Sequence, residues 1–368
     1  MFEKISQLEN LLAAYYLTRS GKRDNRKVCH FDFFLEPNLV KLRFELLSSN
    51  YNPSPYTHFT VYDPKTRQVA APVFRDRVIQ HSLVAAIEPL FEKKFIYDSY
   101  ACRKGRGTHF GTRRVKKFLM AARCLNGKER EIYVLQGDIA KFFQSISWDI
   151  LLGFIAKTIP CPKTLALIEK IVTTHQTANG EDKQLSLFSS KKFAKQTVSV
   201  KDRKGLPIGN LTSQLFANVY LNELDHFVKE TLKERWYSRY MDDFMIIHPD
   251  KNHLKAVKEK IREFLKEKLD LNLHPKKATL KNVKDGVPFV GYRIFYDHIL
   301  VRGSTLKRMQ RKYRHKVKLV KKGILTKEKL RQTENSLKGH LKHANAYWLS
   351  QMMFAQKHLT LVSKNSIN

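Results

Sequence analysis

Hydrophobic positions recur at helical spacing near both ends of the chain, whereas the middle mixes helical segments with short runs typical of strands. Residues 4–22 and 36–50 place apolar side chains three or four positions apart, which predicts amphipathic helices in an N-terminal extension over 1–55. The basic stretch 20–27 separates the two helices. The same spacing over 306–324 predicts a helical C-terminal part over 301–368.

The central part of the chain combines strand and helix patterns. Alternation over 56–78, interrupted by Asp-Pro-Lys-Thr, predicts a hairpin that is followed by a helix over 79–95. Further helices are predicted over 163–175, from Ser213 onward and within 253–280, where a short strand follows, and a second hairpin is predicted over 287–295. The variable stretch within 160–204 is polar and basic after its helical part, which predicts an irregular excursion.

The stretch RYMDDFMII at 239–247 points most directly to chemistry. Aromatic and β-branched residues on both sides predict two short strands, 236–240 and 244–248, joined by a tight turn. This arrangement places Asp242 and Asp243 side by side at the tip of a hairpin. Adjacent carboxylates on an apolar hairpin repel each other unless a cation lies between them. Carboxylate oxygens favour Mg²⁺ or Mn²⁺, which are commonly shared with substrate phosphates.

A third carboxylate, Asp138, ends the strand in YVLQGDIAKFFQSI (133–146). One carboxylate from a strand end and two from a hairpin are typical of a two-metal phosphoryl-transfer site. The alternative for the hairpin alone is an ordinary Asp-rich turn, but its flanks are too apolar for a surface turn.

The charge balance favours a polyanionic partner. The chain holds 68 Lys and Arg against 34 Asp and Glu, a formal net charge of +34, and such an excess destabilises a compact state through self-repulsion. Nucleic acid explains this excess better than an anionic membrane does. From 302 to 345 there are 15 Lys and Arg and two acidic residues, which predicts a basic helical face that follows a duplex.

The sequence does not favour a zinc-binding, disulfide-rich, secreted or membrane-spanning protein. The four cysteines, at positions 29, 102, 124 and 161, have neither zinc-site nor disulfide spacing. We find no secretory signal and no apolar run long enough to span a bilayer. We therefore expect a cytoplasmic protein without a membrane partner.

The Tyr-Met-Asp-Asp hairpin and the strand ending at Asp138 together resemble the palm of reverse transcriptases. Residues 67–77 (RQVAAPVFRDR) match, without a gap, the fingers segment of group II intron and related bacterial reverse transcriptases. Residues 98–119 resemble a further segment of that family, with Ala101 and Cys102 in place of the usual Gly-Phe. The resemblance covers about 56–295.

Residues 205–230 resemble the second palm motif of the same family, with two departures. Ile208 occupies the position where glutamine is usual, and Ser213-Gln214 replaces the usual Ser-Pro. These departures resemble the reverse transcriptases of diversity-generating retroelements, which copy a template-repeat RNA into mutagenised cDNA.

The resemblance implies roles for individual residues. Two Mg²⁺ ions, with Mn²⁺ as a possible substitute, would be held by Asp138, Asp242, Asp243 and the backbone carbonyl of Ile139. Lys277, or alternatively Lys276, would lie near the leaving pyrophosphate. The incoming dNTP would contact Lys65, Arg67, Phe143, Ile208 and Gly209. Template and primer would contact Arg75, Arg77, Arg103, Arg106, Ser213, Gln214, Tyr240, Phe289, Gly291 and Tyr292. Phe143 would crowd the sugar 2′ position, while Phe142, on the opposite face of an extended segment, would pack in the core.

The expected fold is an α+β right-hand polymerase with fingers over 56–132, a palm over 133–300 and a basic helical thumb over 301–368. The expected activity is RNA-directed DNA synthesis that produces error-prone, adenine-mutagenised cDNA. Implied partners are template RNA, the RNA/DNA duplex, dNTPs and a small basic helical-bundle accessory protein. Alternatives are a retron, abortive-infection or group II intron-type reverse transcriptase, and a non-catalytic, maturase-like RNA-binding factor. We expect no further DNA-binding or endonuclease domain.

Overall fold

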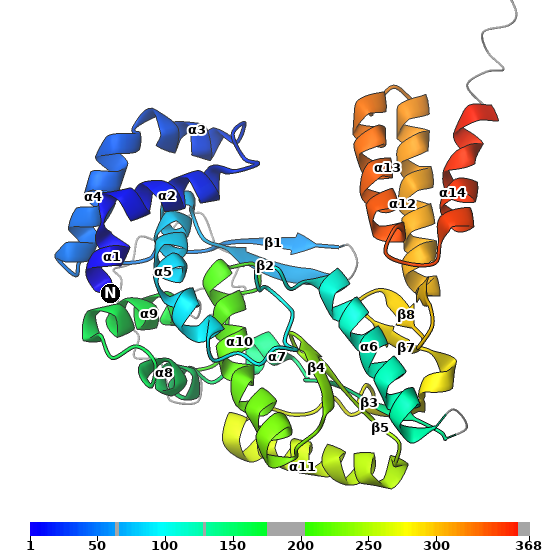
Figure 1. Ribbon diagram of the computed structural model, residues 1–368. Helices are drawn as coiled ribbons and strands as arrows, with labels where there is room; N and C mark the ends of the chain where they lie inside the picture. Colours follow the sequence, from blue (N-terminus) through cyan, green and yellow to red (C-terminus); the bar gives the residue numbers. More distant parts are fainter. Residues whose placement is uncertain (63–65, 128–129, 175–202, 360–368) are drawn as a thin grey trace, which may run out of the picture. The chain divides into compact units, whose positions relative to one another are not determined.

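The computed structural model describes residues 1–62, 66–127, 130–174 and 203–359 (Figure 1). These residues fall into two compact units. The first unit comprises Met1–Tyr97, Asp138–Lys233 and Glu259–Pro275. The second comprises Asp98–Gly137, Glu234–Lys258 and the chain from Lys276 onward. Because these units are compact groups of segments and not functional domains, the division into fingers, palm and thumb stays a prediction.

Four helices open the first unit: α1 (Phe2–Ser6), α2 (Leu8–Arg19), α3 (Arg26–Phe33) and α4 (Leu35–Leu47). The prediction of two helices separated by a basic stretch was incomplete, because α3 begins within that stretch. The Asn25 side chain accepts a hydrogen bond from the Lys27 amide at 3.0 Å, which caps the start of α3. Helix α2 packs against α4 and against α5 (Phe74–Glu92), which buries residues such as Leu11 and Leu83.

The predicted hairpin after the N-terminal helices is confirmed as β1 (Thr57–Val61) and β2 (Arg67–Ala71), an antiparallel pair. The strand ends at Ala71 because Pro72 has no amide hydrogen for a ladder. Helix α5 begins at Phe74, shortly after this proline and five residues before the predicted start at 79. Position 65, at the predicted hairpin tip, lies outside the described residues.

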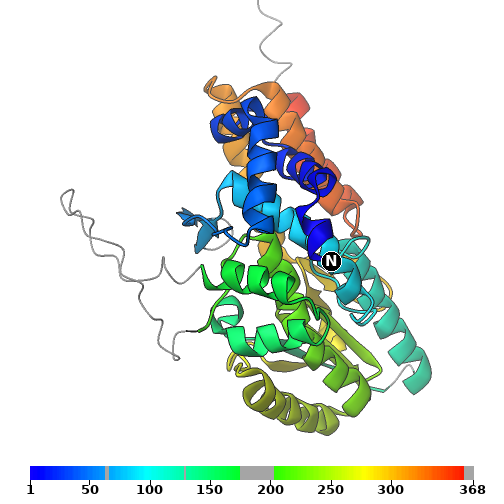
Figure 2. The same ribbon diagram turned by 90° about the vertical axis from the view of Figure 1, so that its left-hand side faces the viewer.

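The rest of the first unit is mainly helical. It contains α7 (Phe142–Ser145), α8 (Trp148–Ala156), α9 (Pro162–Thr173), α10 (Leu211–His226) and a π-helical turn, η3 (Phe227–Thr231). Helix α10 packs against α5 and α8, and α8 packs against α9 (Figures 1 and 2). The predicted helices at 163–175 and from 213 are confirmed with small shifts, whereas 175–202 of the predicted excursion lies outside the described residues.

A four-stranded sheet in the order β4-β5-β3-β6 underlies the second unit. Its strands are β3 (Tyr133–Asp138), β4 (Trp236–Tyr240), β5 (Asp243–His248) and β6 (Thr279–Asn282). The pairs β4/β5 and β3/β6 are antiparallel. Helix α6 (Thr108–Asn126) packs against β4 and β5, and the amphipathic α11 (Lys251–Leu269) follows β5 as predicted.

A smaller antiparallel sheet consists of β7 (Val287–Phe289), β8 (Tyr292–Ile294) and β9 (Ile299–Val301), and a short 3₁₀ turn, η4 (Val283–Asp285), precedes it. The predicted hairpin at 287–295 is confirmed, whereas the third strand was not predicted. Helix α6 and both sheets share one apolar core, to which Tyr100, Val115, Met245, Phe289 and Tyr292 contribute.

The C-terminal part is helical as predicted, with α12 (Gly303–Lys321), α13 (Lys327–Leu341) and α14 (Tyr347–Leu359) side by side in Figure 1. These helices bury a core of their own that includes Met309, Tyr313, Leu330, Leu337 and Phe354. None of the helices in the described ranges is both long enough and apolar enough to cross a membrane.

Candidate active site

The Tyr-Met-Asp-Asp segment forms a tight antiparallel hairpin. Tyr240 pairs with Asp243, so only Met241 and Asp242 lie in the turn. Met241 has a φ of +56°, a left-handed conformation that non-glycine residues seldom adopt. The structure therefore places Asp242 in the turn and Asp243 at the first position of β5, whereas the sequence analysis placed both at the tip.

Strands β3 and β5 are neighbours in the sheet. A Cβ atom placed on Gly137 would lie 2.1 Å from Cζ of Phe244, so only glycine fits against this ring. Gly137 directly precedes Asp138, and Phe244 directly follows Asp243. Gly137 and Phe244 both belong to the second unit, and their packing places the last part of β3 beside the start of β5. Asp138, which is buried, follows Gly137 directly in the chain.

Backbone hydrogen bonds fix the direction of the chain after β3. The His274 amide donates to the Asp138 carbonyl at 2.7 Å, and the Ala140 amide donates to the Asn272 carbonyl at 2.8 Å. These bonds flank an antiparallel bridge between Ile139 and Leu273. Because the flanking residues make both bonds, the Ile139 carbonyl points away from Leu273, as in the wide pair of an antiparallel ladder.

Phe143 lies in α7, whose preceding residue Lys141 has a φ of +47°. The expectation of an extended segment after Asp138 was therefore wrong, because a left-handed residue turns the chain into a short helix. Phe142 is nevertheless buried and Phe143 is half-buried, with the two rings at an edge-on angle and 5.4 Å apart.

The loop that carries Ile208 and Gly209 lies against β2 in the first unit. Gly209 has a φ of +112°, and a Cβ atom there would lie 2.9 Å from Cγ1 of Val69. Arg67 is exposed at the start of the same strand. The structure thus brings three predicted dNTP contacts, Arg67, Ile208 and Gly209, onto neighbouring segments, while Lys65 lies outside the described residues.

Four predicted template- or primer-binding arginines have partners within the protein. Arg75 forms an ion pair with Glu45, and Arg77 donates to the Pro72 carbonyl at 2.9 Å. Arg103 is buried and donates to the Ser99 carbonyl at 2.7 Å, and the Arg106 guanidinium lies 5.5 Å from the centre of the Phe110 ring. Their nucleic-acid contacts stay predictions.

The remaining predicted contacts differ in exposure. Ser213 is buried near the start of α10 and Gln214 is half-buried, while Lys276 and Lys277 are exposed in the turn after Pro275. Tyr240 is also half-buried, and its hydroxyl lies 3.3 Å from Oγ1 of Thr108.

The β7–β8 hairpin contains the other predicted primer contacts, Phe289 and Tyr292 in the strands and Gly291 in the turn. Gly291 has a φ of +92°, whereas Phe289 and Tyr292 are buried. The Tyr292 hydroxyl donates to the His340 carbonyl at 2.9 Å and lies 3.3 Å from Nδ1 of His109. The side chains of Phe289 and Tyr292 therefore stabilise the hairpin from within the core.

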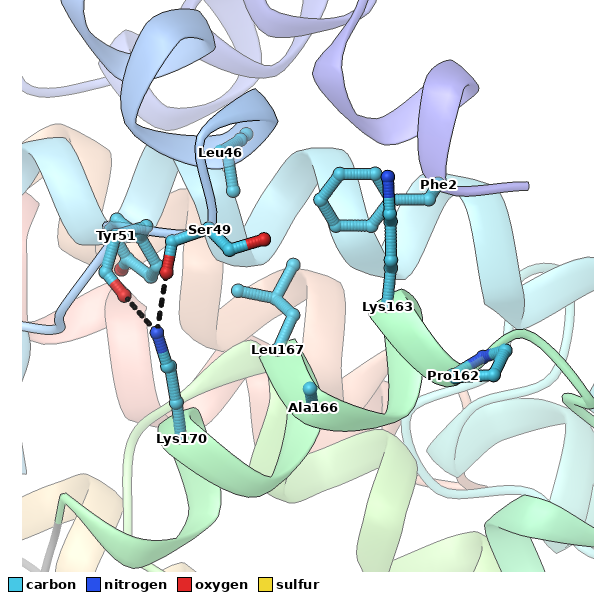
Figure 3. A pocket seen from close by; sticks show the side chains of 9 residues that line it. All are labelled: Phe2, Leu46, Ser49, Tyr51, Pro162, Lys163, Ala166, Leu167 and Lys170. Carbon is cyan, nitrogen blue, oxygen red and sulfur yellow. Dashed lines mark hydrogen bonds between the residues drawn. The ribbon is translucent and has the colours of Figure 1, made fainter.

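A pocket of about 290 Å³ lies in the first unit, between the N-terminal helices and α9 (Figure 3). Phe2, Leu46 and Leu167 line its apolar wall. The Lys170 ammonium group donates to the Ser49 and Tyr51 carbonyls at 2.9 and 3.0 Å. These two bonds tie α9 to the segment that connects α4 to β1, which gives Lys170 a structural role.

Carboxylate and carbonyl oxygens are the ligands that Mg²⁺ and Mn²⁺ prefer, so Asp138, Asp242, Asp243 and the Ile139 carbonyl fit such ions chemically. Within the described ranges, no three His, Cys, Asp or Glu side chains form a group that could hold a metal by themselves. Mg²⁺ in phosphoryl-transfer sites is usually bound by one or two carboxylates together with substrate phosphates. Asp242 and Asp243, adjacent in the hairpin of the second unit, are carboxylates of this kind.

Sequence reasoning missed two residues that shape this region. Gly137 allows β3 to pack closely against Phe244. The sequence did carry a signal for this contact, because a glycine inside an apolar strand often marks the close approach of another segment. The second residue is Arg239, which is fully buried in β4. No sequence pattern distinguishes it from the many surface arginines.

Several known proteins are similar to this chain. The model of the reverse transcriptase (RNA-dependent DNA polymerase) family matches residues 62–294, more than half of the chain, and such domains generally use divalent metal ions. The protein YkfC of Escherichia coli K12 is 29% identical over 296 residues, which cover 71% of this chain and 72% of YkfC. The group II intron-encoded protein LtrA of Lactococcus lactis subsp. cremoris is 23% identical over 75% of this chain, and the match spans 52% of LtrA.

A solved structure shares the fold. Telomerase from Candida tropicalis, in complex with a fragment of telomeric RNA, superimposes with a TM-score of 0.50 and 12% identity, covering 88% of this chain and 59% of that chain. The expected right-hand polymerase fold, built from helices and sheets, is thereby confirmed. Together with the family match over residues 62–294, these findings show that the chain belongs to the reverse transcriptase (RNA-dependent DNA polymerase) family.

Proposed function

We propose that this protein synthesises DNA on an RNA template, with its active site at the ends of β3 and β5. The observation that carries this proposal is the packing of Gly137 on Phe244, beside Asp138 and Asp243. The excess of basic residues, +34 in formal charge, supports a nucleic-acid substrate.

In the proposed reaction, the 3′-hydroxyl of a primer attacks the α-phosphate of a dNTP and pyrophosphate leaves. When bound, Mg²⁺ ions would supply Lewis-acid chemistry, lowering the pKa of the attacking hydroxyl and neutralising phosphate charge. Asp138, Asp242, Asp243 and the Ile139 carbonyl would hold them. Arg67 would bind the triphosphate together with Lys65, because charge on the phosphate oxygens grows toward the transition state.

Two further residues would act on the nucleotide. Lys277, exposed in its turn, would donate a proton or a hydrogen bond to the leaving pyrophosphate. Phe143, half-buried in α7, would occupy the space beside the sugar 2′ position and exclude ribonucleotides.

For the RNA substrate, we propose a template-repeat RNA of a diversity-generating retroelement, on the basis of Ile208 and Gln214. The side chain of Ile208 has neither a hydrogen-bond donor nor an acceptor. It therefore cannot stabilise a correctly aligned nascent base pair through a hydrogen bond. Loss of one such hydrogen bond lowers the free-energy preference for the correct base pair by roughly 1 kcal/mol, which raises the misincorporation frequency about fivefold. A small basic helical-bundle protein would be the accessory partner.

The relatives favour a second candidate substrate, an intron RNA. LtrA is a group II intron-encoded protein, and nuclear intron maturase 1 of Arabidopsis thaliana is 25% identical over 47% of this chain. An intron-type enzyme would copy its template faithfully, whereas a maturase without polymerase activity would bind RNA and synthesise no DNA.

One experiment separates these assignments. A defined RNA is copied in Mg²⁺ by the wild type and by Ile208→Gln, and the cDNA is sequenced. The retroelement assignment is supported if the wild type makes frequent errors opposite template adenines and Ile208→Gln makes fewer. A faithful wild type, alone and with its accessory protein, supports the intron-type enzyme, and absence of any cDNA contradicts the polymerase proposal.

A further inference from the structure

We propose that Arg239 is a positioning residue that holds the Met241–Asp242 turn in its working shape. Arg239 lies in β4, three residues before Asp242, and its side chain is fully buried. The proposal rests on the polymerase activity proposed above, and it assigns a role to a residue outside the metal-binding, nucleotide-binding and primer-binding sets.

The Arg239 guanidinium donates hydrogen bonds to the hairpin turn and to a distant segment. Nη1 donates to the Met241 carbonyl at 3.1 Å, and Nη2 donates to Oγ of Ser99 at 3.2 Å. Both donors belong to one rigid, planar group, so fixing one bond restricts the direction of the other. The turn that carries Asp242 is thereby tied to the buried Ser99.

The segment around Ser99 is itself firmly anchored in the second unit. The Arg239 amide donates to the Asp98 carbonyl at 3.0 Å, and the Tyr100 amide donates to the Arg239 carbonyl at 3.0 Å. The Asp98 carboxylate accepts from Nε and Nη2 of Arg114, on α6, at 2.7 and 2.9 Å. A continuous set of hydrogen bonds therefore runs from α6 through Asp98 and Arg239 to the turn.

The turn needs such support because of its backbone. Met241 adopts a φ of +56°, which is unfavourable for a residue with a side chain, so the turn by itself also samples other shapes. Asp242 follows Met241 directly, and any rotation there moves the carboxylate. Arg239 acts through the Met241 carbonyl, and because a shift of about 1 Å in a reacting group costs on the order of 100-fold in rate, this bond sets how well Asp242 is placed.

The test uses steady-state primer extension on an RNA template with three variants. Arg239→Met keeps most of the side-chain volume and removes every donor, whereas Arg239→Lys keeps the charge and loses the planar fork. Ser99→Ala removes only the partner of Nη2. The matched control is Arg262→Met, which removes an arginine that is 62% exposed on α11.

We expect Arg239→Met to lower kcat by about 10- to 100-fold. Arg239→Lys and Ser99→Ala should cause smaller losses, and Arg262→Met should leave kcat unchanged. The Kd for the RNA/DNA duplex and the KM for dNTP should stay within about threefold of wild type, because the turn's shape and not substrate binding is altered. A role in stability alone would lower the active fraction and Tm, and would leave the kcat per folded molecule unchanged.

Each outcome distinguishes the two proposals. An inactive wild type contradicts the proposed polymerase function. An active wild type with unchanged kcat per folded molecule in Arg239→Met overturns only the role of Arg239. If Arg239→Met does not fold, unchanged kcat in both Arg239→Lys and Ser99→Ala overturns that role, and a loss in both supports it.

Discussion

Replacing Gly137 with alanine should push apart the two strands that carry the candidate metal ligands. The added Cβ would lie 2.1 Å from Cζ and 2.4 Å from Cε1 of Phe244. Non-bonded carbon atoms prefer about 3.5–4.0 Å, so the strands or the ring must move by roughly 1 Å or more. Because Phe244 is only 3% exposed, the ring has little room to move and the strands take most of the shift.

The displacement has two measurable consequences. Overpacking of this kind lowers the free energy of unfolding by about 1–3 kcal/mol. A shift of about 1 Å between Asp138 and Asp243 lowers the polymerisation rate by on the order of 100-fold, because the reacting groups depend on close placement. We expect Gly137→Ala to remain folded, to bind an RNA/DNA duplex normally and to extend primers about 100-fold more slowly.

A control and a rescue make this prediction specific. A Cβ at Gly153, in α8, meets nothing within 4 Å, so Gly153→Ala should leave the rate unchanged and slightly stabilise its helix. Combining Gly137→Ala with Phe244→Leu frees space beside β3 and should recover part of the lost rate. Wild-type activity in Gly137→Ala would refute the idea that this close packing sets the spacing of the carboxylates.

Three other properties can be measured. Phe143→Ala should raise rNTP incorporation relative to dNTP in a competition assay, and unchanged discrimination would mean that Phe143 only packs in α7. Changing three exposed lysines of α12 (Lys307, Lys312 and Lys318) to glutamine should reduce the slope of log Kd against log salt by about three, because fewer counterions are released. An unchanged slope would mean that this face does not bind phosphates. Burial, followed by nearby histidine and arginine charges, lowers the pKa of His109 and His340, so the unfolded chain binds more protons in mildly acidic solution. The free energy of unfolding of the protein should therefore fall as pH drops below about 6.5, less so in His109→Asn, and a pH-independent stability in denaturant titrations would contradict this.

Much of the architecture follows from local sequence patterns. Alternation with a tight turn correctly predicted the hairpins at 56–78 and 236–248, and apolar spacing predicted α9, α10, α11 and the C-terminal helices. The same patterns placed Asp138 at a strand end and Asp242 in a turn. These features were predictable because neighbouring residues alone determine them.

Other features depend on an unusual backbone conformation or on contacts between distant segments, and no local pattern revealed them. The helical geometry of Phe143 depends on the left-handed conformation of Lys141 and contradicted the extended segment that was predicted. The order of the sheet places β3 beside β5 through Gly137 and Phe244, which are more than 100 residues apart in sequence. Burial of Arg239 likewise depends on Ser99 from another segment.

We propose that the carboxylates at the ends of β3 and β5 hold the metal ions for RNA-templated DNA synthesis. Primer extension on an RNA template in Mg²⁺, by the wild type and by Asp242→Asn, tests it most directly, with duplex affinity measured in parallel. The substitution keeps the shape and removes a charge that a divalent ion requires, so we expect extension to fall by several orders of magnitude with duplex affinity nearly unchanged. Substantial extension by Asp242→Asn would contradict the proposed site.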